Sequence, residues 1–474
     1  MTTTWETVVG LEVHVQLATA SKMFCGCSTT FGEAPNTNVC PVCLGLPGAL
    51  PVPNEQAIRL ATRAALALEC TVHETSVFAR KNYFYPDLPK GYQISQFDQP
   101  LATGGVLRCE SPDRGPLAVG ITRLHVEEDA GKSLHDRFPG LTAVDLNRAG
   151  VPLAEIVSEP DLRSPAEARA YLTAIRQLLV FAGISDCSME KGSLRVDANL
   201  SVRPMGQTTL GTRTEVKNMN SFANVERALE AERARQIALI EGGGRVQQVS
   251  LLFNAATGEV RPMRSKEDSH DYRYFPDPDL PPLIVTQAWI EGERSALPEL
   301  PDAMRARLAS QYGLSAYDAG VLSGEVAIAR YFEAVVAAGA EAKASANWIM
   351  GEALTDWNVL ERFPVNPGIM AGLIALVANG TVSHQAGRKV YTELSARGGD
   401  PLAVAQHLGL VQVRDESALE TWVDEVLAAC PAEVGRFKGG EAKLMGFLTG
   451  QVMRRSGGKA DPKGIQVVLV RKLS

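Results

Sequence analysis

The chain has 474 residues, a formal net charge of −7 and 45% hydrophobic residues. This composition is typical of a globular protein with a substantial core, and ordinary domain sizes predict about three domains. No apolar run of about 18 residues is present to span a bilayer, and the first residues lack the basic and apolar regions of a signal peptide. We therefore expect a cytoplasmic protein with no membrane partner.

The first predicted strand, at residues 11–17, alternates strictly between polar and apolar residues. Glu12, His14 and Gln16 share one face, while leucines and valines face a core. The same alternation aligns polar residues in three later stretches. These residues are Arg123, His125 and Glu127, then Ser193, Arg195, Asp197, Asn199, Ser201 and Arg203, and finally Arg213, Glu215 and Lys217.

One such face is usually only a solvated surface, but four in one domain favour a binding face. Carboxylates that hold Mg²⁺, beside Arg or Lys that neutralise phosphate charge, are typical of a phosphoryl-transfer site. Ala130-Gly-Lys-Ser133 is similar to the end of a P-loop, but Val126 stands where its first glycine belongs. We therefore predict a phosphoryl-transfer site on a sheet face rather than in a P-loop.

Four of the eight cysteines form a C-x-C pair and a C-x-x-C pair that twelve residues separate. They are Cys25, Cys27, Cys40 and Cys43. Two such knuckles present four thiolates to Zn²⁺ in a closed, structural site, and the alternative is four ordinary buried thiols. The isolated cysteines, which we expect to be small core residues, are Cys70, Cys109, Cys187 and Cys430.

Short alternating stretches dominate residues 7–285, with two long helical patterns at residues 165–182 and 221–241. This mixture predicts an α+β domain on an antiparallel sheet. Prolines between residues 275 and 301 exclude helix interiors, so we place the end of this domain near residue 293. An all-α helical domain at residues 294–400 and a small helical tail domain at 401–474 are predicted to follow. The clearest helical patterns beyond the boundary are residues 325–338, 345–361, 369–378 and 416–429.

Basic residues concentrate at the C-terminal end. Residues 438–474 hold eight Lys or Arg and two acids, so they carry +6 while residues 1–437 carry −13. A basic end on an acidic body indicates a local contact with a polyanion. Within this tail, residues 441–455 predict a helix, and Asp461 caps the next helix with Pro462 at its first position. The apolar side of the first of these helices comprises Leu444, Phe447, Leu448 and Val452.

Long blocks of the sequence can be compared with known families, among them Arg80-Lys-Asn-Tyr-Phe-Tyr-Pro-Asp87 and Tyr272-Arg-Tyr-Phe-Pro-Asp-Pro-Asp279. The other blocks are residues 5–15, 91–96, 123–132, 145–156 and 188–195. Together they resemble the B subunits of the aspartyl/glutamyl-tRNA amidotransferases, and the resemblance covers essentially the whole chain. It implies a cradle domain similar to glutamine synthetase, then a helical domain, then a tail that contacts tRNA.

The resemblance also implies an activity. In that family the cradle uses ATP and Mg²⁺ to phosphorylate the side-chain carboxyl of Glu or Asp mischarged on tRNA(Gln) or tRNA(Asn), and ammonia then displaces the phosphate. Acyl phosphate formation supplies the leaving group that a carboxylate lacks at neutral pH. The implied partners are an amidase (glutaminase) subunit, which releases ammonia from glutamine, a small third subunit that completes a heterotrimer, and the misacylated tRNA.

By the same resemblance, particular residues acquire roles. The Mg²⁺ site falls on Glu12, His14 and Glu127, although His suits a second-shell role or Mn²⁺ better than Mg²⁺. Lys81 and Lys90 lie near the reaction chamber and the ammonia route. ATP or substrate contacts are expected from Tyr83, Arg195, Asp197, Arg203, Arg213 and Lys217. Contacts with tRNA are expected from Lys438, Lys443, Arg454, Arg455, Lys459 and Lys463. Only some family members carry the four cysteines, which supports a structural zinc.

Two alternatives stay open. A ligase that acts on a free amino acid would need the same polar sheet but no basic tail. A non-catalytic tRNA-binding or assembly module would leave Glu12, Glu127 and the arginine-bearing strands without a purpose. No amidase-like nucleophile segment is present, so we expect the chain alone to use ammonia and not glutamine.

Overall fold

The computed structural model describes residues 4–263, 272–412 and 415–473. The chain divides into two compact units, Met1–Pro301 and Asp302–Ser474. A boundary at Pro301 agrees with the proline-rich end predicted for the first domain. The finer division into three domains stays a prediction, and its tail domain includes residues 413–414 and 474, which lie outside the described residues.

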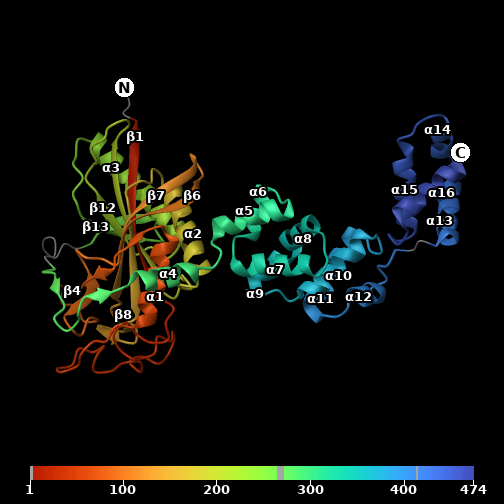
Figure 1. The fold of residues 1–474 in the computed structure, drawn as a ribbon. Coiled ribbons are helices and arrows are strands. Elements are labelled where there is room, and N and C mark those ends of the chain that lie inside the picture. The colour runs from red at the N-terminus through yellow and green to blue at the C-terminus, as the bar shows by residue number, and fades with distance from the viewer. Residues whose placement is uncertain (1–3, 264–271, 413–414, 474) are drawn as a thin grey trace. The chain divides into compact units, whose positions relative to one another are not determined.

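A nine-stranded sheet forms the centre of the first unit, in the order β14-β13-β12-β11-β1-β10-β7-β6-β2 (Figure 1). The bounds are β1 (Trp5–Gln16), β2 (Thr71–Val72), β6 (Ala102–Ser111), β7 (Gly115–Glu128), β10 (Pro152–Ser158), β11 (Leu194–Pro204), β12 (Thr214–Lys217), β13 (Ser250–Asn254) and β14 (Glu259–Pro262). The central strand β1 pairs antiparallel with both β10 and β11. All four stretches with polar alternation are therefore strands of one sheet.

The sheet is mixed, which corrects the prediction of a purely antiparallel one. Strands β12 and β13 run parallel. Helix α3 (Phe222–Glu241) connects them, and a crossover helix of this kind returns the chain to the same end of the sheet.

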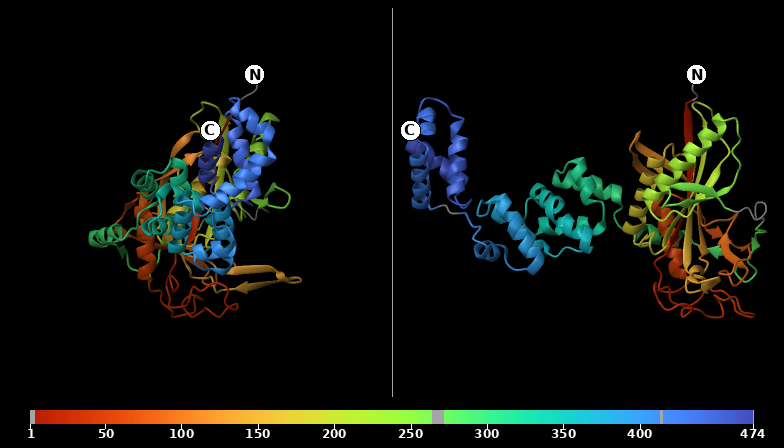
Figure 2. Two further views of the ribbon diagram at one scale, coloured as in Figure 1. Left: turned by 90° about the vertical axis from the view of Figure 1, so that its right-hand side faces the viewer. Right: turned by 180° about the vertical axis from the view of Figure 1, so that it is seen from behind.

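Helices cover one face of this sheet. Ser164 caps α2 (Pro165–Phe181) and Ser221 caps α3, as side-chain acceptors of backbone N–H groups. The two helices lie side by side against β6 and β11 (Figure 2). A third helix, α1 (Glu55–Ala67), was not predicted; Asn54 caps it, and Ile58, Leu60 and Ala61 are buried in the same core. The side chains of β1 that face this core are Val9, Leu11, Val13 and Val15.

Three smaller sheets and one short helix complete the first unit. The three-stranded sheet has the order β15-β4-β5, and the pairs β16-β3 and β8-β9 stand alone. Their bounds are β3 (Thr75–Ser76), β4 (Phe78–Asn82), β5 (Tyr92–Gln96), β8 (Lys132–Phe138), β9 (Leu141–Asp145), β15 (Phe275–Pro276) and β16 (Leu283–Ile284), with helix α4 at Gln287–Ser295. Phe275 pairs with Arg80, so the segment around residue 274 lies beside β4.

The second unit is helical up to residue 412, as predicted. Its helices are α5 (Pro301–Tyr312), α6 (Ala316–Leu322), α7 (Val326–Ala337), α8 (Ala342–Trp348), the π-helical turn η1 (Ile349–Ala353), α9 (Leu354–Leu360), α10 (Pro367–Ala378), α11 (His384–Arg397) and α12 (Pro401–His407). In the part of the chain that the structure describes, no helix is both long and apolar enough to cross a membrane.

Four further helices share a core of their own. They are α13 (Glu416–Ala429), α14 (Pro431–Lys438), α15 (Leu444–Arg455) and α16 (Pro462–Leu473). Leu448 and Val452 are buried in this core, as predicted. Phe447 is not, because 42% of it is exposed, and α15 begins at Leu444 rather than at residue 441. The cap at Asp461 is confirmed, since its carboxylate accepts the N–H of Gly464 at 2.9 Å.

Candidate functional site

Polar side chains from four strands meet on the sheet face opposite the core. In the antiparallel register His14 on β1 stands between Arg195 on β11 and Glu155 on β10. Glu155 in turn stands opposite His125 on β7. Because side chains alternate along a strand, one row of the sheet carries Arg195, His14, Glu155 and His125 on the same face.

The first acidic group consists of His14, Glu127 and Glu155, whose ligand atoms all lie within 4.8 Å of one another. His14 Nε2 is 3.4 Å from Glu155 Oε2 and 3.9 Å from Glu127 Oε1. His125 Nε2 is 3.2 Å from Glu155 Oε2 and 3.6 Å from Glu127 Oε2. Ser95 Oγ donates a hydrogen bond to Glu127 Oε2 at 2.9 Å and fixes that carboxylate further.

The buried charges of this group stabilise one another. Burial by itself lowers the pKa of His125, but hydrogen bonds to Glu127 and Glu155 raise it to about 9. Burial opposes ionisation of Glu155, yet hydrogen bonds from His125 and His14 hold its pKa below the usual range. The same balance, with His125 as the main partner, lowers the pKa of Glu127. Both carboxylates are therefore ionised at neutral pH.

A second acidic group consists of Glu12, Asp197 and Glu215. Lys217 Nζ lies 2.7 Å from Asp197 Oδ2 and 2.9 Å from Glu215 Oε1. Burial first, then the neighbouring carboxylates, raises the pKa of Glu12. Asn199 Nδ2 donates to Glu12 Oε1 at 3.0 Å. The structure thus places Glu12 in a group adjacent to that of His14 and Glu127.

A cavity of about 440 Å³ opens beside this second group. Its lining includes Gly10 and Glu12 of β1, Ser158 of β10, Asn199 of β11 and the exposed Arg213. Volumes of a few hundred cubic ångströms suit a small-molecule ligand. An acidic edge and one exposed guanidinium are the groups that a metal-bound polyphosphate needs.

Lys81 lies near the first group, inside an aromatic wall. Its Nζ is 4.8 Å from the ring centroid of Tyr272. The Tyr272 ring meets the rings of Tyr83 and Tyr274 edge to face, each at 6.1 Å between centroids. Burial opposes the charge of Lys81, but the nearby carboxylates, Glu127 above all, raise its pKa. The ammonium group is therefore charged at neutral pH. Burial also raises the pKa of Tyr83, so its hydroxyl stays protonated.

Three of the predicted site residues are already paired inside the protein. Both terminal nitrogens of Arg195 donate to Asp129, at 2.8 and 3.0 Å. Arg203 Nε donates to Glu6 Oε2 at 2.6 Å. Lys90 pairs with Glu128. These pairs fix the edges of the site and leave Lys81, Arg213 and Lys217 as the cations closest to the two acidic groups.

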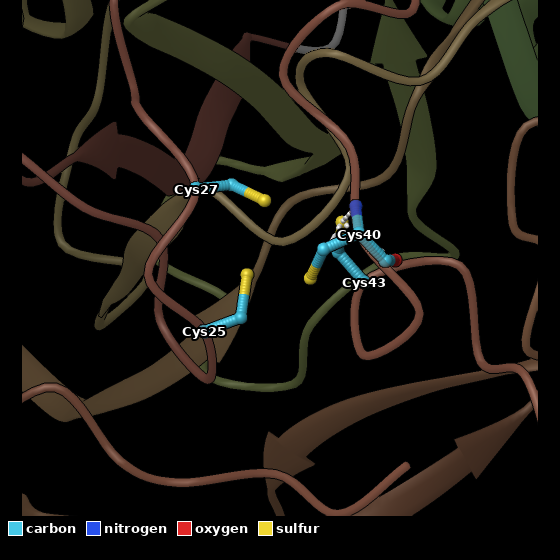
Figure 3. A group of neighbouring side chains, drawn as sticks. All are labelled: Cys25, Cys27, Cys40 and Cys43. Atoms are coloured by element: carbon cyan, nitrogen blue, oxygen red, sulfur yellow. Dashed lines mark hydrogen bonds between the residues drawn. The ribbon is translucent and has the colours of Figure 1, made fainter.

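The four clustered cysteines come together, as the spacing predicts. Their sulfur atoms lie within 4.8 Å of one another, and Figure 3 shows Cys25 and Cys27 facing Cys40 and Cys43 from a separate loop segment. The backbone N–H of Cys40 points at Cys43 Sγ, at 3.2 Å. A hydrogen bond from Cys25, with the Cys40 N–H and the Lys22 ammonium, lowers the pKa of Cys43 to about 4. This donor set fits a thiophilic metal ion such as zinc.

Among the isolated cysteines, Cys70 and Cys187 are buried, as expected of core residues. Cys109 and Cys430 are only partly buried.

Comparison with known proteins agrees with this architecture. Residues 7–291 match the model of the GatB/GatE catalytic domain, and residues 330–473 match that of the GatB domain. The chain belongs to the GatB family. It is 53% identical over 476 residues to the B subunit of the aspartyl/glutamyl-tRNA(Asn/Gln) amidotransferase of Geobacter sulfurreducens, with 99% of each chain covered. It is 54% identical over 475 residues to the protein of that name from Moorella thermoacetica, covering 99% of this chain and 100% of the other.

Within this GatB-family chain, sequence reasoning missed Glu155 and the two tyrosines of the aromatic wall. The strand that carries Glu155 reads Pro152-Leu-Ala-Glu-Ile-Val-Ser158 and shows no regular polar face. Tyr272 and Tyr274 reach Lys81 only because β15 pairs with β4. All three residues stand in blocks that resemble the family, which was the available signal.

The six basic residues predicted to contact tRNA are all exposed in the four-helix tail. Arg455 Nε lies 2.6 Å from Glu425 Oε2. Within residues 415–473, no ion pair involves the other five, which are Lys438, Lys443, Arg454, Lys459 and Lys463. Arg471 and Lys472, at the end of α16, pair with acids of α13.

Proposed function

We propose that this chain converts misacylated Glu-tRNA(Gln), Asp-tRNA(Asn) or both into the correctly amidated forms, using ATP. The observation that carries the proposal is the meeting of two acidic groups, one charged lysine and one cavity on a single sheet face. The names of its relatives state an amidotransferase of Asn and Gln tRNA and one lettered subunit of it, which supports both the substrate and the presence of other subunits.

The chemistry takes two steps. An oxygen of the substrate carboxylate attacks the γ-phosphorus of ATP, a new P–O bond forms, and ADP leaves. Ammonia then attacks the acyl carbon, the C–O bond to phosphate breaks, inorganic phosphate leaves, and the nitrogen loses its extra proton. Negative charge accumulates on the phosphoryl oxygens in the first step, and the Lys81 ammonium is suited to stabilise it.

The residues present fit Mg²⁺. Glu127 and Glu155 offer ionised carboxylates in one group, and Glu12, Asp197 and Glu215 offer three more in the next. Carboxylate oxygens are the ligands that Mg²⁺ prefers, whereas the imidazole of His14 fits it less well. When bound, the ion supplies positive charge that neutralises the phosphates and aligns them with the attacking carboxylate.

The nucleotide is assigned to the cavity beside Glu12. Arg213 lies at its rim for phosphate, and Lys217 holds Asp197 and Glu215 at a fixed separation. The carboxyl end of the substrate is assigned to the neighbouring group with Lys81 and Tyr83. Arg195 and Arg203 act through their partners Asp129 and Glu6, as positioning residues rather than as phosphate ligands.

Zinc is assigned to the four cysteines, where it would close the two knuckles and leave no open position. The exposed basic residues of the tail are assigned to tRNA phosphates, which read backbone shape rather than sequence. The implied partners are an amidase (glutaminase) subunit and a small third subunit in a cytoplasmic heterotrimer. As the carbon–nitrogen ligase component, the chain would receive its ammonia from the amidase.

One experiment separates this function from the alternatives. The purified chain is incubated with ATP, Mg²⁺ and ammonium, with misacylated tRNA or with free glutamate and aspartate. ATP hydrolysis that requires misacylated tRNA, with amide formed on that tRNA, is the expected result. Hydrolysis with the free amino acids would indicate a free-amino-acid ligase, and tRNA binding without hydrolysis would indicate a non-catalytic module.

A further inference from the structure

Lys22 is a fully buried lysine beside the cysteine cluster. Its exposed fraction is 0%, and it stands directly before the first knuckle, where its backbone N–H donates to the carbonyl of Cys27 at 2.9 Å. Lysine is rarely buried completely, because removing an ammonium group from water is costly unless an opposite charge compensates it. The partners of its ammonium group are therefore informative.

Three acceptors surround Lys22 Nζ, which matches its three N–H donors. They are the carbonyl oxygen of Asn38 at 2.6 Å, the carbonyl oxygen of Leu146 at 3.4 Å and Cys43 Sγ at 3.6 Å. The two carbonyls are neutral, so Cys43 is the only one of these three partners that can carry a negative charge. The nearby Glu128 is held by Lys90 instead.

The charge of a four-cysteine metal site explains this arrangement. Four thiolates around a divalent ion leave two uncompensated negative charges, in a region that is half withdrawn from water. A fixed ammonium group within hydrogen-bonding distance of one sulfur cancels one of them. We propose that Lys22 supplies the positive charge that allows all four cysteines to bind metal as thiolates, and that it thereby sets the metal affinity of the cluster.

This inference rests on the proposed metal site and makes a demand that packing alone does not. With metal bound, Lys22 faces a thiolate and stabilises the site. Without metal, the cysteines can take up protons, and the same ammonium group becomes a buried charge with weaker compensation. Replacing it with a neutral side chain of similar length should therefore have opposite effects on the two forms.

The test compares the full-length wild type with Lys22→Met, and with the exposed Lys191→Met as a matched control. Zinc affinity is measured by competition with a chromophoric chelator, and melting temperature is measured in saturating zinc and in excess chelator. We expect Lys22→Met to bind zinc about 10- to 100-fold more weakly. We also expect its metal-free form to melt at or above the temperature of the metal-free wild type, while Lys191→Met behaves like the wild type.

The inference is overturned if Lys22→Met keeps wild-type zinc affinity, or if it lowers the melting temperature equally with and without zinc. If Lys22→Met yields no folded protein, Lys22→Gln serves in its place, because it is neutral and still donates hydrogen bonds to a carbonyl. Zinc bound by Lys22→Gln as tightly as by the wild type would overturn the inference. A wild-type chain that binds no zinc would instead overturn the proposed metal site itself.

Discussion

His14 and Glu155 face each other across the pair β1–β10, with His14 Nε2 3.4 Å from a carboxylate oxygen of Glu155. Glu155 also contacts His125 and thus joins β1 to β7 at the level of the first acidic group. A strand between two histidine-bearing strands therefore supplies the carboxylate that both of them share.

Replacing Glu155 with Gln should lower transamidation by roughly 100- to 1000-fold, because one charged group that faces the reacting phosphate is lost. Glu127→Gln should lower it similarly, and Glu12→Ala should abolish it through the second group. The control is Glu110→Gln, an exposed carboxylate on β6. Initial rates of amide formation on misacylated tRNA decide the matter, and near-wild-type rates in the Glu155 and Glu127 variants would contradict the proposed site.

The pH dependence of the metal-free protein should report on His125. Its folded pKa of about 9 lies above the ordinary value of 6.5, so its ion pairs stabilise the fold fully below pH 6.5. That contribution, up to about 3 kcal/mol, should disappear as the pH rises from 6.5 through 9. Denaturant unfolding at both pH values is the measurement. His125→Gln should lose less stability than the wild type over this range; an identical loss would contradict the prediction.

The cysteine cluster should hold one zinc per chain. Cys40→Ser should lose the metal and lower the melting temperature on the order of 10 °C, because a closed site needs all four ligands. Activity should fall only as a consequence, since the backbone contacts Met23 to Gly150 and Gly150 to Asp129 connect the knuckles to the active sheet. Elemental analysis of Cys40→Ser and of the control Cys430→Ser is decisive; stoichiometric zinc in Cys40→Ser would show that the site has been misidentified.

The basic tail should bind tRNA through the five exposed cations that form no ion pair within residues 415–473. Deleting residues 438–474 would weaken tRNA binding but would also remove α15 and α16 from the core they share with α13. Substitution is therefore the sharper test. Changing Lys438, Lys443, Arg454, Lys459 and Lys463 to Gln should weaken tRNA binding and reduce its salt dependence, by a slope of about one for each lost phosphate contact.

Arg455→Gln is the matched control for the tail, because Arg455 is already paired with Glu425. ATP binding by the cradle should be unchanged in the five-residue variant. An unchanged tRNA affinity and salt slope in that variant would mean that the tail is only a solvated surface.

Local periodicity explains how much of the sheet was predictable. Residues 11–17 and 193–203 alternate with a period of two, so the faces that carry Glu12, His14, Arg195 and Asp197 follow directly from the sequence. Pairing register does not follow from it. Glu155 belongs to a strand that is buried on both faces and shows no alternation, so only its register against β1 and β7 reveals its role.

Contacts between distant segments set the other limit. Tyr272 and Lys81 are brought together by the short β15–β4 pairing, which no local pattern encodes. The parallel pair β12–β13 likewise depends on how α3 returns the chain to the sheet. The cysteine cluster was predictable because its ligands are close in sequence and their spacing alone restricts the geometry.

Amide formation by the purified chain shows whether the sheet face performs ATP-dependent amidation of a tRNA-bound carboxyl group. The quantity to measure is the Gln-tRNA(Gln) or Asn-tRNA(Asn) formed from misacylated tRNA, ATP, Mg²⁺ and ammonium, without an amidase partner. We predict amide formation that requires ATP and is lost in Glu155→Gln, and none with glutamine in place of ammonium. Amide formation that continues without ATP, or undiminished in Glu155→Gln, would refute the proposed function of this face.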